Sequence, residues 1–213
     1  MKLTLSLLSL LLVSAGSVSA AEPNRTLDTD VSLGSATSIE VKVPVGDLTV
    51  TGTGGERIKA RLEIFCDADA GASCLEAAKK LAVNTRNRGS ELLVQVEGYP
   101  RISHRGLSAN LKVEVPRGVR FEADGGVGDV RISGMNGDVE VGQGVGDVFI
   151  QVDKGKVHRV ELDTGVGEAV LVIDGGRIEG SGLVSKGLEW TGGKGAALIE
   201  VDTGVGDITV ELD

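Results

Sequence analysis

Aromatic side chains are scarce in this sequence, with one Trp, one Tyr and three Phe among 213 residues. Proteins that stack on sugar rings or nucleobases do so with aromatic faces. The formal net charge of −9 would also repel a phosphate backbone. Composition therefore argues against a nucleic-acid partner and against an aromatic platform for sugars.

Histidine and cysteine are equally rare, with two of each. No G-x-S-x-G elbow is present, and the spacing of Cys66 and Cys74 does not fit a CxxC redox or zinc site. Parallel β-helix enzymes that cleave acidic polysaccharides cluster acids with Lys or Arg on one strand face. The only local mixture of that kind is Asp153, Lys154, Lys156, His158 and Arg159. A solvated turn explains these residues better, so we predict no catalytic, cofactor-binding or metal-binding residues.

Only one long apolar run occurs, at the start of the chain. A positive Met1-Lys2, the run LTLSLLSLLLV and a small-residue end at Ala20 are typical of a secretory signal peptide. Residues 1–20 are therefore predicted to be removed, which leaves a soluble protein that is periplasmic or secreted. In an exported chain Cys66 and Cys74 are expected to form a disulfide, which would close a short loop and contribute roughly 2.5 kcal/mol; the alternative is two unpaired thiols.

Charge is distributed unevenly. Residues 79–120 hold nine Lys or Arg against three acids, a net of +6, whereas residues 121–213 hold eighteen acids against seven bases, a net of −11. A solvated surface accounts for this pattern, and the alternative is a bipolar molecule that pairs head to tail or presents its basic end to an anionic partner. The basic segment RISHRG at 101–106, which contains His104, is predicted to be a surface loop.

Period-2 alternation over 39–50, 57–65, 91–97 and 111–115 predicts strands in residues 21–120. Ser73-Cys74-Leu75-Glu76 has the form of a capping box, and strong helix formers follow it. One helix is therefore predicted near 74–84.

A Val-Gly-acid step recurs along the chain, once as Pro-Val-Gly-Asp and four times after glycine. The units that contain it begin at Ile39, Phe121, Val139, Val160 and Ile199, and the last four are separated by 18, 21 and 39 residues. Spacing near 20 residues predicts a β-solenoid over 121–213, continuous with the strand-rich part before it.

In this interpretation the repeated step is a corner between strands. The valine (Val205 in the last unit) points inward, the glycine adopts φ > 0, and the acid bonds backbone amides. The predicted corner residues are Gly46, Asp47, Gly128, Asp129, Gly137, Asp138, Gly146, Asp147, Gly167, Glu168, Gly206 and Asp207.

A calcium-binding repeat is an alternative, because GGVGDVRI at 125–132 approaches the GGxGxDxUx nonapeptide. The acid falls one residue early, however, which turns it to the opposite face of the strand. Phosphate binding is disfavoured because a strand follows each glycine-rich step, whereas phosphate loops precede a helix.

The signal peptide, the strand-rich start and the GVGD[VIL]x[VIL] units resemble the bacterial β-strand-repeat adhesin family, most clearly over 121–213. The resemblance implies a β-helix-like, exported or envelope-associated protein of unknown function, with no catalytic residues to carry over. The expected role is a non-enzymatic interaction module, with a β-helix enzyme acting on an acidic polysaccharide as one alternative and a calcium-binding repeat as another. Residues 210–213 are predicted to end inside a strand, so we expect an open edge there that contacts another copy or an envelope protein or glycan.

Overall fold

The computed structural model describes residues 22–100, 106–182 and 184–213, in two stacked β-sheets. In order across the nine-stranded sheet lie β1(Arg25–Ser32), β4(Arg57–Cys66), β7(Leu107–Pro116), β3(Leu48–Thr53), β9(Val130–Ser133), β11(Val148–Val152), β17(Ile208–Leu212), β13(Ala169–Ile173) and β14(Gly176–Glu179). Across the eight-stranded sheet lie β15(Lys186–Thr191), β12(Val157–Val166), β16(Ala197–Val205), β10(Val139–Val145), β8(Arg120–Val127), β2(Ser38–Val45), β6(Glu91–Glu97) and β5(Ala82–Arg88). The predicted signal peptide and His104 lie outside the described residues.

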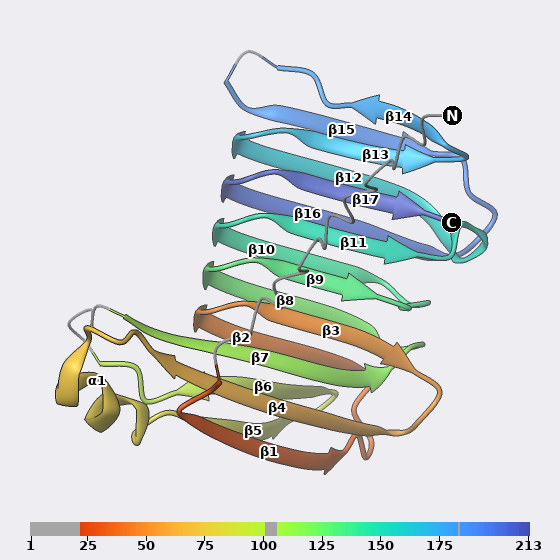
Figure 1. Cartoon of the computed structure of the whole chain (residues 1–213). Coiled ribbons are helices and arrows are strands. Elements are labelled where there is room, and N and C mark those ends of the chain that lie inside the picture. The colour runs from red at the N-terminus through yellow and green to blue at the C-terminus, as the bar shows by residue number, and fades with distance from the viewer. Residues whose placement is uncertain (1–21, 101–105, 183) are drawn as a thin grey trace, which may run out of the picture.

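The core lies between the two sheets, whose strands are stacked along one axis (Figure 1). Successive side chains of a strand point to opposite faces of the sheet, so every second side chain points inward, and in these strands the inward side chains are mostly apolar. The eight-stranded sheet contributes the inner row Ile39, Phe121, Val139, Ile199 and Val160, each 1% exposed or less. The nine-stranded sheet contributes Leu48, Val130, Val148, Ile208 and Ala169, each 2% exposed or less.

Each repeated unit consists of one strand in each sheet, joined by the glycine step. These pairs are β2–β3, β8–β9, β10–β11, β12–β13 and β16–β17. Neighbouring units pair in parallel and in matching register, so equivalent residues form straight rows across both sheets.

The prediction of a β-solenoid is wrong. The chain forms two open, mixed sheets in a sandwich-like arrangement, with antiparallel strands β1, β4, β5, β14 and β15 at the ends. The units also do not stack in chain order, because β16–β17 lies between β10–β11 and β12–β13. The spacing of 39 residues arises because 174–196 includes the two end strands β14 and β15 before the chain turns back into the stack.

The predicted open edge at the C-terminus is also wrong. Strand β17 pairs with β11 on one side and with β13 on the other, so both of its edges are occupied. It is therefore an interior strand of the sheet.

The single described helix, α1(Gly71–Ala78), begins and ends earlier than predicted. Its N-cap is Ala70, with no side-chain hydrogen bond, so the expected capping box does not form. The disulfide Cys66–Cys74 is confirmed, and it joins the end of β4 to this helix.

Glycine is required at the corners for two reasons. Gly46, Gly128, Gly146, Gly167 and Gly206 have φ between +124° and +152°, where other residues are strained. A Cβ atom on any of them would lie 1.9–2.3 Å from a carbonyl oxygen of the neighbouring layer. Only a residue without a side chain allows the layers to approach this closely.

Replacing Gly146 with alanine should therefore lower the free energy of unfolding by about 3 kcal/mol or more, because strain and a backbone clash add together. Gly142→Ala is the matched control in β10, the strand that ends just before Gly146, since no atom lies within 4 Å of the Gly142 Cβ position. Urea unfolding of both variants measures the difference. Equal destabilisation by the two substitutions would contradict this role of the corner glycine.

Candidate functional site

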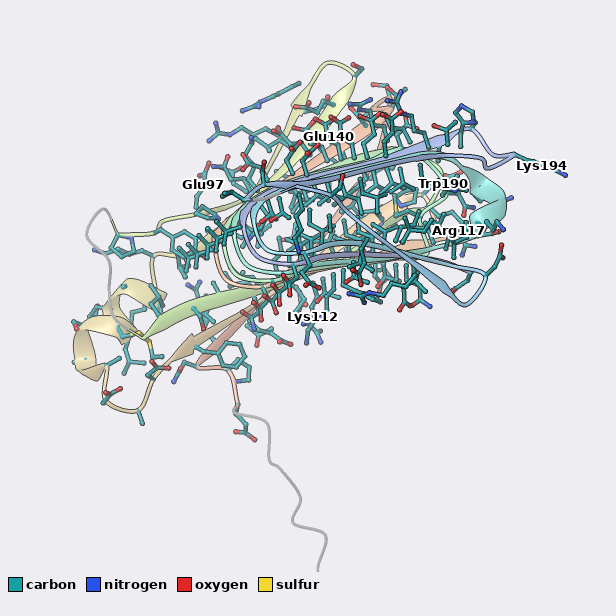
Figure 2. All side chains as sticks on the ribbon, turned by 90° about the horizontal axis from the view of Figure 1, so that it is seen from above. Glu97, Lys112, Arg117, Glu140, Trp190 and Lys194 are labelled. Carbon is teal, nitrogen blue, oxygen red and sulfur yellow. A yellow bond between two sulfur atoms is a disulfide. The ribbon has the colours of Figure 1, made fainter. Side chains whose placement is uncertain are left out.

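Carboxylates form two rows on the outer face of the eight-stranded sheet. The apolar-Glu-apolar pattern of the units places a glutamate outward in successive strands, and parallel register aligns them. We define the acid face as the row Glu40, Glu122, Glu140, Glu200, Glu161 and Glu189 together with the neighbouring Asp124, Asp202 and Asp163. Figure 2 shows Glu140 on this side of the molecule and Lys112 on the opposite side.

Cations neutralise part of the acid face. The ion pairs are Lys42 with Glu40 (2.5 Å) and Asp124 (2.9 Å), Arg88 with Glu40 (3.5 Å), Arg120 with Glu140 (2.5 Å), and Arg159 with Glu161 (2.5 Å) and Glu189 (3.0 Å). Glu122, Glu200, Asp202 and Asp163 form no ion pair with any described residue. The uncompensated charge therefore concentrates at these four residues within the rows.

Three of these carboxyl groups are held in an environment that disfavours their charge. Partial burial raises the pKa of Glu122, and the carboxylates of Glu140 and Glu40 add to the effect. Partial burial also raises the pKa values of Glu200 and Asp202, with further contributions from neighbouring carboxylates that include Glu140. The repulsion between these neighbouring carboxylates is relieved when a positive charge approaches.

Gly142 leaves a gap in the second row. It lies between Asp124 and Asp202, and the space where its side chain would be is empty to 4 Å. A side chain from a partner can therefore approach these two carboxylates from outside the sheet.

The predicted corner acids form a hydrogen-bonded column, in which each carboxylate accepts from the backbone amide of the next acid. The bonds are Asp129 N to Asp47 Oδ1 (3.0 Å), Asp147 N to Asp129 Oδ1 (3.1 Å), Asp207 N to Asp147 Oδ1 (2.9 Å) and Glu168 N to Asp207 Oδ1 (2.8 Å). At one end of the column Asn110 Oδ1 accepts from Asp47 N (3.2 Å), and at the other end Glu168 pairs with Arg177 (3.3 Å) and Lys186 (3.7 Å).

A parallel set of backbone bonds supports this column. The amides of Gly46, Gly128, Gly146 and Gly206 donate to the carbonyls of Val127, Val145, Val205 and Val166 at 2.8–2.9 Å. At the end of the set the Tyr99 hydroxyl donates to the Val45 carbonyl, in place of a corner glycine. Burial raises the pKa of Tyr99 to about 12, so this hydroxyl keeps its proton at neutral pH.

Gly137 and Asp138 lie outside the column, immediately before β10. A Cβ atom on Gly137 would lie 2.4 Å from the Val119 carbonyl oxygen, and Asp138 Oδ1 accepts from Leu198 N at 3.0 Å. This step therefore occupies the opposite end of the strand from the other corners.

The predicted inward direction of the corner valine is wrong. Val205 is 47% exposed, and the equivalent valines of the other units are also exposed, by 37% to 57%. Polar side chains two residues before the valine occupy the inside of the corner instead. Gln143 Nε2 donates to the Val145 carbonyl (3.0 Å), and Thr164 Oγ1 donates to the Gly206 carbonyl (2.9 Å). The recurring Thr-Gly-Val-Gly sequence at 164 and 203 is the signal that would have located this inner polar row.

The mixed cluster of acids, bases and His158 does not converge on one point. Asp153 Oδ1 accepts from Gly155 N (2.7 Å) in the short turn η1(Lys154–Lys156), Lys154 pairs with Asp174 (2.5 Å), and Arg159 joins the acid face. In the described ranges no three His, Cys, Asp or Glu side chains gather closely enough to hold a metal ion. Residues 101–105 of the predicted basic loop lie outside those ranges.

A concavity of about 510 Å³ lies on the outer face of the nine-stranded sheet, over β1, β4, β7 and β3. The basic side chains of its wall are paired with acids of the wall or beside it. Arg61 pairs with Asp28 (2.7 Å), Lys59 with Glu114 (3.7 Å) and Lys112 with Glu63 (2.9 Å). The acid face therefore has a stronger unsatisfied charge than this groove.

No protein-family model matches the sequence, and no curated protein matches it. A "putative cell adhesion protein" from Clostridium sporogenes ATCC 15579 is similar in structure, with a TM-score of 0.53 and 15% identity over 90% of this chain and 100% of that one. A "putative adhesin" from Parabacteroides merdae ATCC 43184 gives a TM-score of 0.31 and 9% identity over 62% and 60% of the two chains. The first of these shows a shared fold. None of the helices in the described part of the chain has the length and apolar character needed to span a membrane.

Asp147→Ala should lower the free energy of unfolding by about 1–2 kcal/mol, because the Asp207 amide loses its acceptor. Asp147→Asn keeps an acceptor oxygen, as Asn110 does at the end of the column, and should change stability by less than about 0.5 kcal/mol. Thermal and urea unfolding of both variants test this. If Asp147→Asn and Asp147→Ala lower the free energy of unfolding by the same amount, the charge of the carboxylate, and not its hydrogen bond, stabilises the corner.

Proposed function

We propose that this protein is an exported, non-enzymatic binding module of the adhesin type, and that its acid face contacts a cationic partner. The observation that carries the proposal is the repetition of outward carboxylates in register across an open sheet. Partly uncompensated charge of one sign on a broad flat face suits recognition of an extended surface. An acidic polysaccharide would be repelled by the same face, which disfavours the alternative of an enzyme acting on such a substrate.

Two further observations support this proposal. The Cys66–Cys74 disulfide is of the kind that persists in oxidising compartments, in agreement with export to the periplasm or beyond. The solved structure with the shared fold is named for cell adhesion.

The binding test compares two triple variants with the same change of charge. Glu122→Gln, Glu200→Gln and Asp202→Asn together neutralise the central acid face, whereas Asp28→Asn, Glu114→Gln and Glu211→Gln neutralise acids of the nine-stranded sheet. Immobilised poly-L-lysine is the probe, at low and at physiological salt. We expect the first variant to bind about tenfold more weakly and the second to change by less than about threefold, because charges that face the probe dominate the interaction.

Stability separates lost binding from lost folding. The folded-state pKa values of Glu122, Glu200 and Asp202 are raised, so their protonated forms stabilise the fold below the unfolded pKa and this contribution is lost as pH rises. At pH 7 the neutral triple variant should therefore be at least as stable as the native protein. Equal losses of poly-L-lysine binding in the two triple variants would exclude the acid face as the contact surface.

A further inference from the structure

An unexplained apolar row runs across the stack beside the acid face. Val45, Val127, Val145, Val205 and Val166 occupy one register position in five neighbouring units, and they are 37%, 52%, 47%, 47% and 57% exposed. We call this row the valine ridge. Four of the five valines, Val127, Val145, Val205 and Val166, have a glycine immediately before and immediately after them in the sequence. Neither adjacent residue therefore carries a side chain beside the valine methyl groups.

The corner geometry does not account for valine at these positions. The glycine and the acid supply the turn and its side-chain hydrogen bonds, and the valine carbonyl accepts from the glycine amide of the neighbouring unit. A β-branched polar residue such as threonine would fit the strand equally well. Contiguous exposed apolar groups with polar borders mark interaction sites more often than isolated ones do.

Acids border the ridge on both sides. The corner acids follow each valine by two residues, and Asp124, Asp202 and Asp163 precede three of the valines by three residues. The second carboxylate oxygens of Asp147 and Asp207 make no hydrogen bond or ion pair with any described residue. Apolar contact along the middle and negative charge along both borders match a partner that is apolar in the middle and basic at its flanks.

We propose that the valine ridge and its flanking acids bind an amphipathic helix with basic flanks, supplied by a partner protein. This inference rests on the proposed function of the acid face and narrows its partner to one structural class. Adjacent strands are about 4.8 Å apart, and one helical turn rises 5.4 Å. A helix lying along the ridge would therefore place about one apolar residue per turn against each valine.

An extended strand fits this spacing less well. Side chains on one face of a strand recur at about 6.6–6.8 Å, so they would lose register with the valines within two steps. The row of five valines is about 19 Å long from end to end, which corresponds to roughly 13 helical residues.

A second copy of this chain is a poor occupant. Two ridges packed together would bring the corner acids of both copies against each other, which is repulsive. The surface of five half-exposed valines is also well below the roughly 800 Å² per partner that a stable dimer buries.

The test uses two synthetic 14-residue peptides of equal positive charge and the exported chain with its disulfide intact. In one peptide leucines lie at helical spacing between lysines, and in the other serines replace the leucines. We expect the Lys/Leu peptide to bind at least tenfold more tightly by calorimetry. The triple variant Val127→Thr, Val145→Thr and Val205→Thr should remove this difference and leave binding of the Lys/Ser peptide unchanged.

Ile178→Thr is the control, because Ile178 is also exposed (41%) but lies on β14, outside the ridge. It should preserve the preference for the Lys/Leu peptide. Equal affinity of the native protein for both peptides, or a preference that survives the triple threonine variant, would overturn the valine ridge while leaving the cationic-partner proposal intact. Failure to bind either peptide would refute both proposals, and unfolding curves of the threonine variant exclude misfolding as the cause.

Discussion

The hydrogen bond between a corner carboxylate and the backbone amide of the next corner is the interaction on which this architecture depends. A chain that bends from one sheet into the other exposes amides at the bend, and each must find an acceptor. Asp47, Asp129, Asp147 and Asp207 supply those acceptors layer by layer, at 2.8–3.1 Å. The glycine before each acid allows the carbonyl oxygen of the adjoining layer to approach where a Cβ atom would otherwise lie.

Regular corners have a consequence for the surface. Because every unit turns at the same residue, equivalent side chains are carried in register across both sheets. Inside, this produces continuous apolar rows, and outside it produces rows of like charge and a row of valines. Partial burial, and after it repulsion between neighbouring carboxylates, raises the pKa values of Glu122, Glu200 and Asp202 on the acid face. The repetition of units in register therefore produces both the apolar core and the outer surface for which we propose a cationic, amphipathic partner.

Local sequence patterns predict the bends and the buried faces of this protein well, because alternation and the Val-Gly-acid step act over a few residues. They do not predict which units become neighbours. The edges of the five units are nearly equivalent, so nothing in the local pattern shows that β16–β17 inserts between β10–β11 and β12–β13. The direction of Val205 was missed for a different reason: Thr203 occupies the inner corner, and alternation does not hold through the glycine that follows. The acid face could have been inferred from the recurring apolar-Glu-apolar pattern once parallel register was known.

Amide hydrogen exchange, followed residue by residue by NMR, tests the corner column most directly. The account predicts that the amides of Asp129, Asp147 and Asp207 exchange as slowly as those of the buried strand residues beside them, such as Val148. It further predicts that Asp147→Ala accelerates exchange selectively at Asp207, whose amide loses its acceptor. Exchange of the three corner amides at the rate of an unstructured peptide would contradict the account, since the carboxylate column would then not hold the layers together.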